Sequence, residues 1–203
     1  MSASAKHPGL RERKKAKTRE TIQHHALELF RTHGYAATTV DQIVTAAEVS
    51  ESTFFRYFPT KEAVVLTDEL DPLFAAAFRE QPAKLGVVAA LRHAMRSVFE
   101  TMNADELADL RDRSVMILDV PELWGAALVQ LTEGMQLIAD MVAQRLGRTA
   151  DEAEVRTFAG AFTGVMIGLQ QTWAEQPEVD IVDSLDEAMA YLQAGLPIGR
   201  KAR

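Results

Sequence analysis

The sequence predicts an all-α protein with two units: a three-helix head over residues 12–66 and a body of about six helices over residues 67–196. Three observations predict this class. Apolar residues recur at helical spacing in successive blocks along the chain. N-cap residues, prolines and glycines bound these blocks. No stretch shows the two-residue alternation that is typical of a strand. We expect residues 1–11 to form a disordered basic arm and residues 197–203 to form a loose tail.

The head begins with a helix expected at about residues 13–33, with Ile22, Ala26 and Phe30 on one apolar face and Gly34 as its C-cap. The next helix starts at a capping box, in which Thr39 precedes Gln42 by three residues. Its apolar positions, from residue 40 to residue 47, again fall on one face.

A second short helix follows over residues 51–57, with Ser50 as its N-cap and Pro59 ending it. This helix is expected to direct three aromatic side chains inward: Phe54, Tyr57 and Phe58. Four side chains are left on its outer face: Glu51, Ser52, Phe55 and Arg56. Two short helices joined by a tight turn, with a small mixed outer face on the second, are typical of a helix-turn-helix.

The stretch TTVDQIVTAAEVSESTFFRYFPTKEAVV resembles the DNA-binding signature of TetR-type transcriptional regulators, and the resemblance covers residues 12–66. It implies a ligand-responsive homodimeric regulator, as a rule a repressor, that an apolar small molecule releases from a palindromic operator. The 51–57 helices would enter two major grooves about 34–36 Å apart or slightly more. The residues expected at the DNA are Arg19, Thr39, Ser50, Glu51, Ser52, Thr53, Phe55, Arg56, Tyr57 and Lys61.

Three positions in the matching stretch carry open alternatives. Glu48 stands where the family turn has glycine, so it either adopts a left-handed conformation at some cost or uses a different turn. Phe55 replaces a phosphate-binding tyrosine, and its ring either contacts a thymine methyl group or packs against the first helix. Lys61 is either the phosphate contact that the family motif implies or a solvated lysine at a helix start.

The distribution of charge favours a nucleic-acid partner although the net charge is −7. Residues 1–66 carry a charge of +3 and residues 67–203 carry −10. The first 20 residues contain seven basic and two acidic side chains. We expect Lys14, Lys15 and Lys17 to lie along a phosphate backbone, as basic arms do.

In the body, helices are expected at about residues 61–79, 82–102, 103–118, 121–146, 151–175 and 181–194. Asn103 is the expected N-cap of the third of these, and Pro121 opens the fourth, which Gly147 closes. The fifth holds Gly160, Gly164 and Gly168, which together cost about 3 kcal/mol relative to alanine. This stripe serves either tight packing inside the subunit or a dimer interface. Because the opposite stripe is apolar too, the helix is expected to be buried on all sides.

The body is also rich in Met and Phe, which either fill the core or line an adaptable apolar cavity. Residues 111–146 are similar to the C-terminal domain of a TetR-type subset associated with acyl-CoA-like or other long apolar ligands. Arg111, Arg113, Gln170 and Gln171 either meet a polar ligand head or lie on solvated helix faces. The candidate effector-binding residues are Phe74, Phe78, Phe99, Met102, Met116, Trp124, Leu128, Met135, Phe162, Met166, Gln170 and Trp173.

Enzyme and cofactor chemistry have little support in the sequence. The chain has no cysteine and five histidines, none of them at metal-ligand spacing with an acidic partner. It has no glycine-rich phosphate loop and no nucleophile elbow. No apolar run approaches the ~18 residues of a membrane span, so we expect a cytoplasmic protein. An all-α enzyme and a ligand-binding protein without DNA binding remain rival interpretations, which a gel shift would separate.

Overall fold

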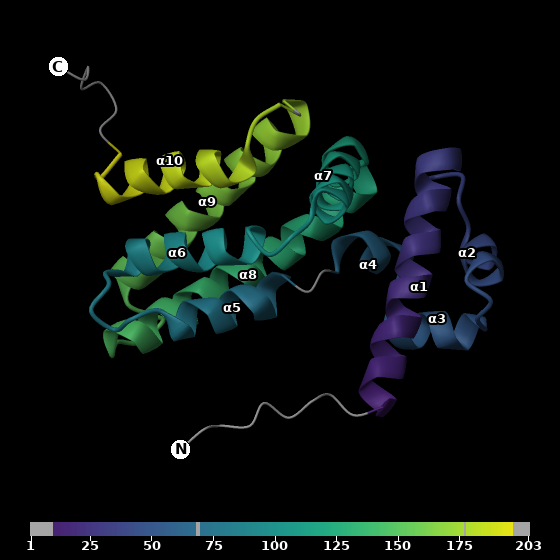
Figure 1. Cartoon of the computed structure of the whole chain (residues 1–203), viewed down its shortest axis with the longest axis horizontal. Helices are drawn as coiled ribbons and strands as arrows, with labels where there is room; N and C mark the ends of the chain where they lie inside the picture. Colours follow the sequence, from purple (N-terminus) through teal and green to yellow (C-terminus); the bar gives the residue numbers. More distant parts are fainter. Residues whose placement is uncertain (1–9, 68–69, 177, 197–203) are drawn as a thin grey trace. The chain divides into compact units, whose positions relative to one another are not determined.

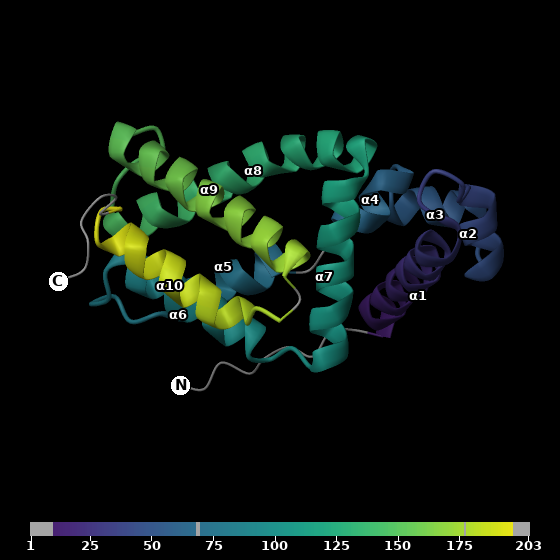
Figure 2. The same cartoon turned by 90° about the horizontal axis from the view of Figure 1, so that it is seen from above.

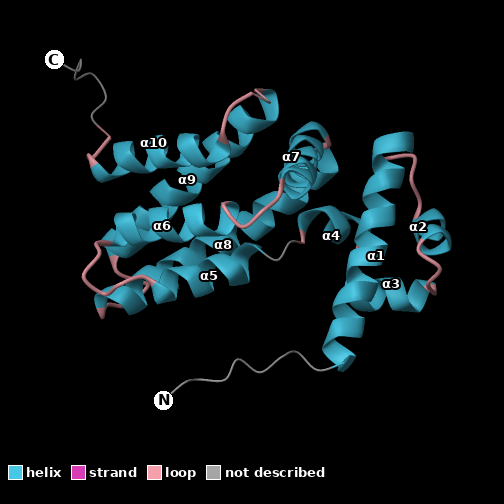
Figure 3. Cartoon of the chain, viewed as in Figure 1, coloured by secondary structure: helices cyan, strands magenta, loops and turns pink. Residues whose placement is uncertain are grey.

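The computed structural model describes residues 10–67, 70–176 and 178–196, and every regular element in them is an α-helix (Figure 3). The predicted all-α class is confirmed. The chain divides into two compact units, residues 1–67 and 68–203. The expected tail and residues 1–9 of the expected basic arm lie outside the described residues. The last two residues of that arm are already helical, because the first helix begins at Leu10.

The head contains α1 (Leu10–His33), α2 (Val40–Ala46), α3 (Glu51–Tyr57) and α4 (Lys61–Leu66). Helix α1 is the long element against which α2 and α4 pack (Figure 1). Gly34 ends α1 with a φ of 84°, as predicted. The largest fully buried side chains of this unit come from all four helices: Ile22, Ile43, Phe54, Phe58, Val64 and Val65.

The single helix expected at residues 61–79 is instead two helices, α4 and α5 (Leu70–Glu80), so the head has four described helices rather than three. Pro72 supplies the physical reason. A proline ring collides with the carbonyl four residues earlier in a continuous helix, and is tolerated only in the first turn. Gln23 of α1 also donates its side-chain amide to the carbonyls of Val64 and Thr67, at 2.8 and 2.9 Å, which satisfies the end of α4.

The remaining helices of the body are α6 (Val87–Phe99), α7 (Ala104–Asp119), α8 (Pro121–Leu146), α9 (Ala153–Glu175) and α10 (Ile181–Gln193). Helix α10 lies along α6 and against α9 (Figure 2). No single helix of the described residues is long and apolar enough to cross a membrane. Only α7 and α8 together meet that length and composition, with a bend of 106° between them.

Helix ends in the body follow the predicted signals except at α6. Asn103 forms a capping box with Glu106, Pro121 opens α8, and Gly147 closes it with a φ of 64°. However, α6 begins after Gly86 and not at Pro82. Residues 81–86 form a connection instead, whose carbonyls accept hydrogen bonds from the guanidinium of Arg145 at 2.5–3.3 Å.

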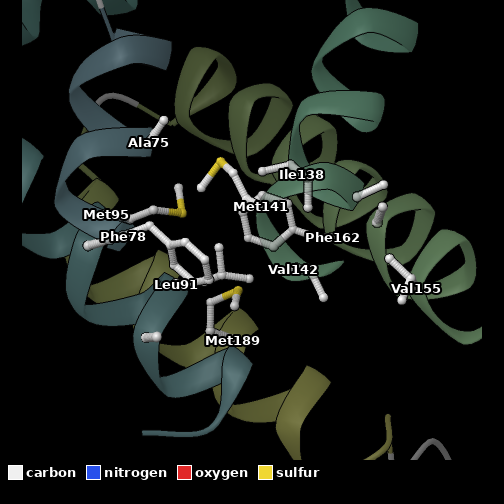
Figure 4. Packing of buried hydrophobic residues seen from close by; sticks show 14 of the residues in the cluster. Ala75, Phe78, Leu91, Met95, Ile138, Met141, Val142, Val155, Phe162 and Met189 are labelled. Atoms are coloured by element: carbon white, nitrogen blue, oxygen red, sulfur yellow. The ribbon is translucent and has the colours of Figure 1, made fainter. Parts of the chain in front are cut away.

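Two apolar clusters hold the body together. The larger one joins α5, α6, α8, α9 and α10, and Figure 4 shows Met95, Met141 and Met189 around the rings of Phe78 and Phe162. The smaller one contains Leu110, Trp173 and Ile181 from α7, α9 and α10. The side chains of Phe99 and Leu169 pack against both clusters.

An ion pair joins α6 to α10. The guanidinium of Arg92 donates two hydrogen bonds to the carboxylate of Asp186, at 2.7 and 3.1 Å, and Arg96 donates a further one. The hydrogen bond from Arg92, joined by that from Arg96, lowers the pKa of Asp186 from 3.8 to about 2.

We expect this pair to make stability depend on acid pH. A depressed carboxyl pKa stabilises the folded state above the unfolded value, and that contribution is lost as the pH falls through the folded value. The free energy of unfolding should therefore drop by about 1–2 kcal/mol between pH 4 and pH 2 through this group. Chemical denaturation of Asp186→Asn should lack this component. An equally steep acid loss in the variant would assign the effect to other carboxyls.

Candidate nucleic-acid interface

The turn between α2 and α3 is built by local hydrogen bonds. The side chain of Thr39 accepts from the backbone N–H of Gln42, whose own side chain accepts from the backbone N–H of Thr39, so the predicted capping box is confirmed. Glu48 has a φ of 52°, the left-handed alternative, which costs roughly 1–2 kcal/mol for a residue with a Cβ atom. Ser50 then caps α3 by accepting from the backbone N–H of Thr53.

Helix α3 has the predicted outer face, and two of the three side chains predicted to point inward are buried. Phe54 and Phe58 are fully buried, whereas Glu51, Ser52, Phe55 and Arg56 are exposed. Tyr57, which was expected inside, is only half-buried, and the guanidinium of Arg56 lies 5.2 Å from the centre of its ring.

The hydroxyl groups at the start of α3 are shared with its cap. The hydroxyl oxygen of Ser50 lies 3.0 Å from that of Ser52 and 2.9 Å from that of Thr53. These two side chains therefore help to hold the helix start. The three long side chains on the outer face of α3 are Glu51, Phe55 and Arg56.

Phe55 is 44% exposed and does not have the burial that packing against α1 would produce. Its ring makes an edge contact with the ring of Phe54, with centroids 5.3 Å apart and planes at 90°. Since Phe54 is fully buried, the exposed ring rests on a fixed neighbour.

Lys61 has a structural role within the head. Its ammonium group donates to the carbonyls of Tyr35 and Thr38, at 3.0 and 3.1 Å, and lies 4.1 Å from the centre of the Tyr35 ring. The Tyr35 hydroxyl in turn donates to Glu62 at 2.9 Å. These contacts fasten the start of α4 to the turn before α2. A lysine ammonium has three N–H donors, and these two carbonyls use two of them.

The described basic residues near the N-terminus lie on α1. Arg11, Lys14, Lys15 and Lys17 are exposed in the first turns of α1. Arg19 is half-buried, and its guanidinium lies 5.6 Å from the centre of the Phe58 ring, beside the end of α3. Helical geometry gives these cations fixed spacings along the α1 surface.

The candidate effector residues do not form one uniform set. Phe78, Phe162 and Trp173 are buried in the two clusters, whereas Leu128 and Met135, which are also candidates, are exposed on α8 and belong to neither cluster. The others are half-buried: Phe74, Phe99, Met102, Met116, Trp124, Met166 and Gln170.

The half-buried residues include a junction between the two clusters. Phe99 and Leu169 pack against both, Met166 packs against the larger and Met102 against the smaller. Leu169 was not among the candidates, although it lies three residues after Met166 on the same helical face. Arg111 is not placed to meet a ligand, because it donates to the carbonyls of Trp173 and Ala174 at the end of α9.

The expectation that α9 is buried on all sides is wrong. A Cβ atom at Gly160 would lie 3.8 Å from the sulfur of Met135, but Gly164 and Gly168 are exposed and a Cβ atom there would meet nothing within 4 Å. On the neighbouring helix α8, Leu128 and Val129 are 49% and 65% exposed. We call these exposed residues of α8 and α9, with Met135 and Gly160, the α8–α9 face.

Comparison with known proteins identifies the family. Residues 22–67 match the family model of bacterial regulatory proteins of the tetR family, and residues 85–197 match the model of the MftR C-terminal domain. The chain belongs to the TetR family. It is therefore a DNA-binding transcriptional regulator and not an enzyme, and the predicted resemblance is confirmed.

Two TetR-family relatives match nearly the whole chain. One is MftR of Mycobacterium tuberculosis, named as a mycofactocin biosynthesis transcriptional regulator, which is 29% identical over 91% of this chain and 96% of its own length. The other is the HTH-type transcriptional regulator TcmR of Streptomyces glaucescens, which is 33% identical over 86% of this chain and 80% of its own length.

Two solved structures share the TetR fold. FadR of Thermus thermophilus, in complex with lauroyl-CoA, has a TM-score of 0.56 and 26% identity, and the match covers 91% of this chain and 97% of FadR. SmeT in complex with triclosan has a TM-score of 0.59 and 21% identity, over 86% of this chain and 90% of SmeT. SmeT is the repressor of a multidrug efflux pump of Stenotrophomonas maltophilia.

For a TetR-family regulator we expect Lys61→Ala to weaken binding to all DNA sequences alike. The salt slope of the binding constant should fall by about 2 per dimer, because each subunit loses one phosphate contact. The variant should also melt at a lower temperature, since three contacts inside the head are lost. Tyr35→Phe is the matched control: it removes the bond to Glu62 and should affect stability without changing the salt slope. An unchanged slope in Lys61→Ala would leave the lysine with a structural role only.

Proposed function

We propose that this protein is a repressor that binds a near-palindromic operator as a homodimer and is released when an apolar small molecule binds in the body. The observation that carries the DNA-binding part is the exposed face of α3. Three long side chains of different chemistry stand on a short helix whose opposite face is fixed by two fully buried phenylalanines.

In this proposal α3 enters the major groove of a half-site. Arg56 is suited to a guanine edge, and the carboxylate of Glu51 is suited to accept from a cytosine amine. The exposed cations of α1 lie along phosphates, which fix the position of the head but carry no sequence information. Two copies of α3, about 34–36 Å apart, then read the two halves of the palindrome.

The second subunit is proposed to cover the α8–α9 face. A monomer gains nothing from an exposed glycine stripe within a helix, because each glycine lowers helix stability by about 1 kcal/mol relative to alanine. Glycine does allow another backbone to approach closely, and the neighbouring helix α8 exposes the apolar side chains of Leu128 and Val129. Apolar residues of this kind are common at the centre of homodimer interfaces.

The effector is proposed to bind at the cluster junction of Phe99, Met102, Met166 and Leu169. These side chains are apolar and half-buried, and methionine adapts its shape to varied ligands. Two proteins of similar fold bind apolar or acyl compounds, lauroyl-CoA in FadR and triclosan in SmeT. A ligand that favours the released state by a few kcal/mol is sufficient to shift the population of DNA-bound protein.

A gel shift with DNA from upstream of the protein's own gene tests the proposal. The full-length protein should retard this fragment at nanomolar to micromolar concentration, and fatty acyl-CoAs or aromatic compounds from a panel should release it. A transcription assay on the same fragment should show less transcript when the protein is present. Binding with increased transcript would make it an activator, and binding that no compound affects would remove the effector role.

A further inference from the structure

We propose that Phe55 reads the C5-methyl group of a thymine, so that each operator half-site carries a thymine opposite this ring. The inference rests on the proposed binding of α3 in the major groove. It concerns which chemical group of the DNA this face recognises, and therefore which base the operator contains.

The exposure of Phe55 sets it apart from its neighbours. Phe54 and Phe58 are fully buried, but the Phe55 ring between them in the sequence is 44% exposed. A phenyl ring has no hydrogen-bond donor or acceptor, so it cannot bond a phosphate oxygen or the polar edge of a base. Among the groups that base pairs present in the major groove, the thymine methyl is the apolar one.

The neighbours of Phe55 favour the groove over the backbone. Glu51 is exposed four residues earlier, which places it on the same face of α3. A carboxylate is repelled by phosphates but accepts from a cytosine amine. The face that carries both side chains is therefore better suited to base edges than to the phosphate backbone.

The orientation of the ring is also restricted. Its edge contact with the buried Phe54 ring, at 5.3 Å between centroids, limits the directions in which it points. A ring held in this way loses little conformational freedom when DNA covers it, and most of the contact with a methyl group then adds to affinity.

The experiment removes the methyl group from the DNA. Full-length protein first selects duplexes from a random-sequence library. The selected duplex is then synthesised with each thymine replaced, one at a time, by deoxyuridine, which pairs identically but lacks the methyl. One position per half-site should weaken binding roughly fourfold, the effect of one buried methylene-sized group. Replacing both should weaken it about tenfold or more. Deoxyuridine at the other thymines should have little effect.

Phe55→Ala links the methyl to this side chain. The variant should bind the thymine duplex about as weakly as the unchanged protein binds the duplex in which both sensitive thymines are replaced. Its own affinity should be the same for these two duplexes. Its melting temperature should barely change, because the ring is exposed. Phe55→Leu is the matched control and should keep part of the discrimination, since it retains an apolar side chain.

Two results would overturn the inference while leaving DNA binding intact. One is a selected duplex in which no thymine is sensitive to loss of its methyl. The other is methyl sensitivity that persists unchanged in Phe55→Ala, which would assign the contact to another residue. If the library yields no preferred sequence at all, the result contradicts the proposed operator binding. The inference about Phe55, which rests on that binding, is then contradicted too.

Discussion

Gly164→Arg should leave the subunit folded, dissociate the homodimer and weaken operator binding by about a hundredfold or more. A Cβ atom at Gly164 would meet nothing within 4 Å in the subunit, and replacing a mid-helix glycine favours the helix itself. At the proposed interface the same side chain would place a charge where two backbones approach. A single head then binds one half-site without the gain of 10²–10⁴ that linking two sites provides.

Sedimentation and thermal unfolding measure this result together. The variant should sediment as the 22.4 kDa subunit and show a cooperative melt. His93→Arg is the control, because it adds the same side chain to an exposed position on α6. A dimeric Gly164→Arg with normal operator affinity would place the subunit interface elsewhere than on the α8–α9 face.

Met166→Trp should fold with near-normal stability, bind the operator and no longer respond to an apolar effector. Met166 is half-buried at the edge of the larger cluster and is, with Leu169, part of the proposed effector site. If this junction admits a ligand, the indole occupies the same space. The expected result is a normal melt and normal DNA binding that fatty acyl-CoAs and aromatic compounds no longer reverse.

Phe162→Trp, one helical turn earlier, is the matched control, because it places the same tryptophan at a position that is packed in the core. Phe162 is 3% exposed, and the centre of its ring lies 6.3 Å from that of Phe74 and 6.5 Å from that of Phe158. A larger side chain there should overpack the cluster at a cost of about 1–3 kcal/mol. If Met166→Trp is destabilised as much as this control, position 166 is packed core and the effector site lies elsewhere.

Two prolines, Pro72 and Pro82, bear on where helices begin and end in the body, but apolar periodicity alone suggests other boundaries. Apolar spacing continues from residue 61 to residue 79 and by itself predicts one helix there. Pro72 forbids a helix through that region, because its ring requires it to lie in a first turn. The same preference predicts a helix start at Pro82, but a proline is equally suited to a connection, where it lies here.

The sequence by itself determined the features that depend on residues a few positions apart. The capping box of Thr39 and Gln42, the N-caps Ser50 and Asn103, and the end of α8 at Gly147 are all local. So is the division of α3 into a buried and an exposed face. Backbone hydrogen bonds and helical periodicity fix such features within four residues, whatever the rest of the chain does.

Only the tertiary structure decided which faces meet. Lys61 bonds carbonyls 23 and 26 residues away, and Arg111 bonds carbonyls more than 60 residues away. Leu128 and Met135 have the apolar chemistry of core residues, yet α8 carries them to the surface. Periodicity tells which side chains share a helix face, but the neighbour of that face is set by how whole helices pack to bury the most apolar surface.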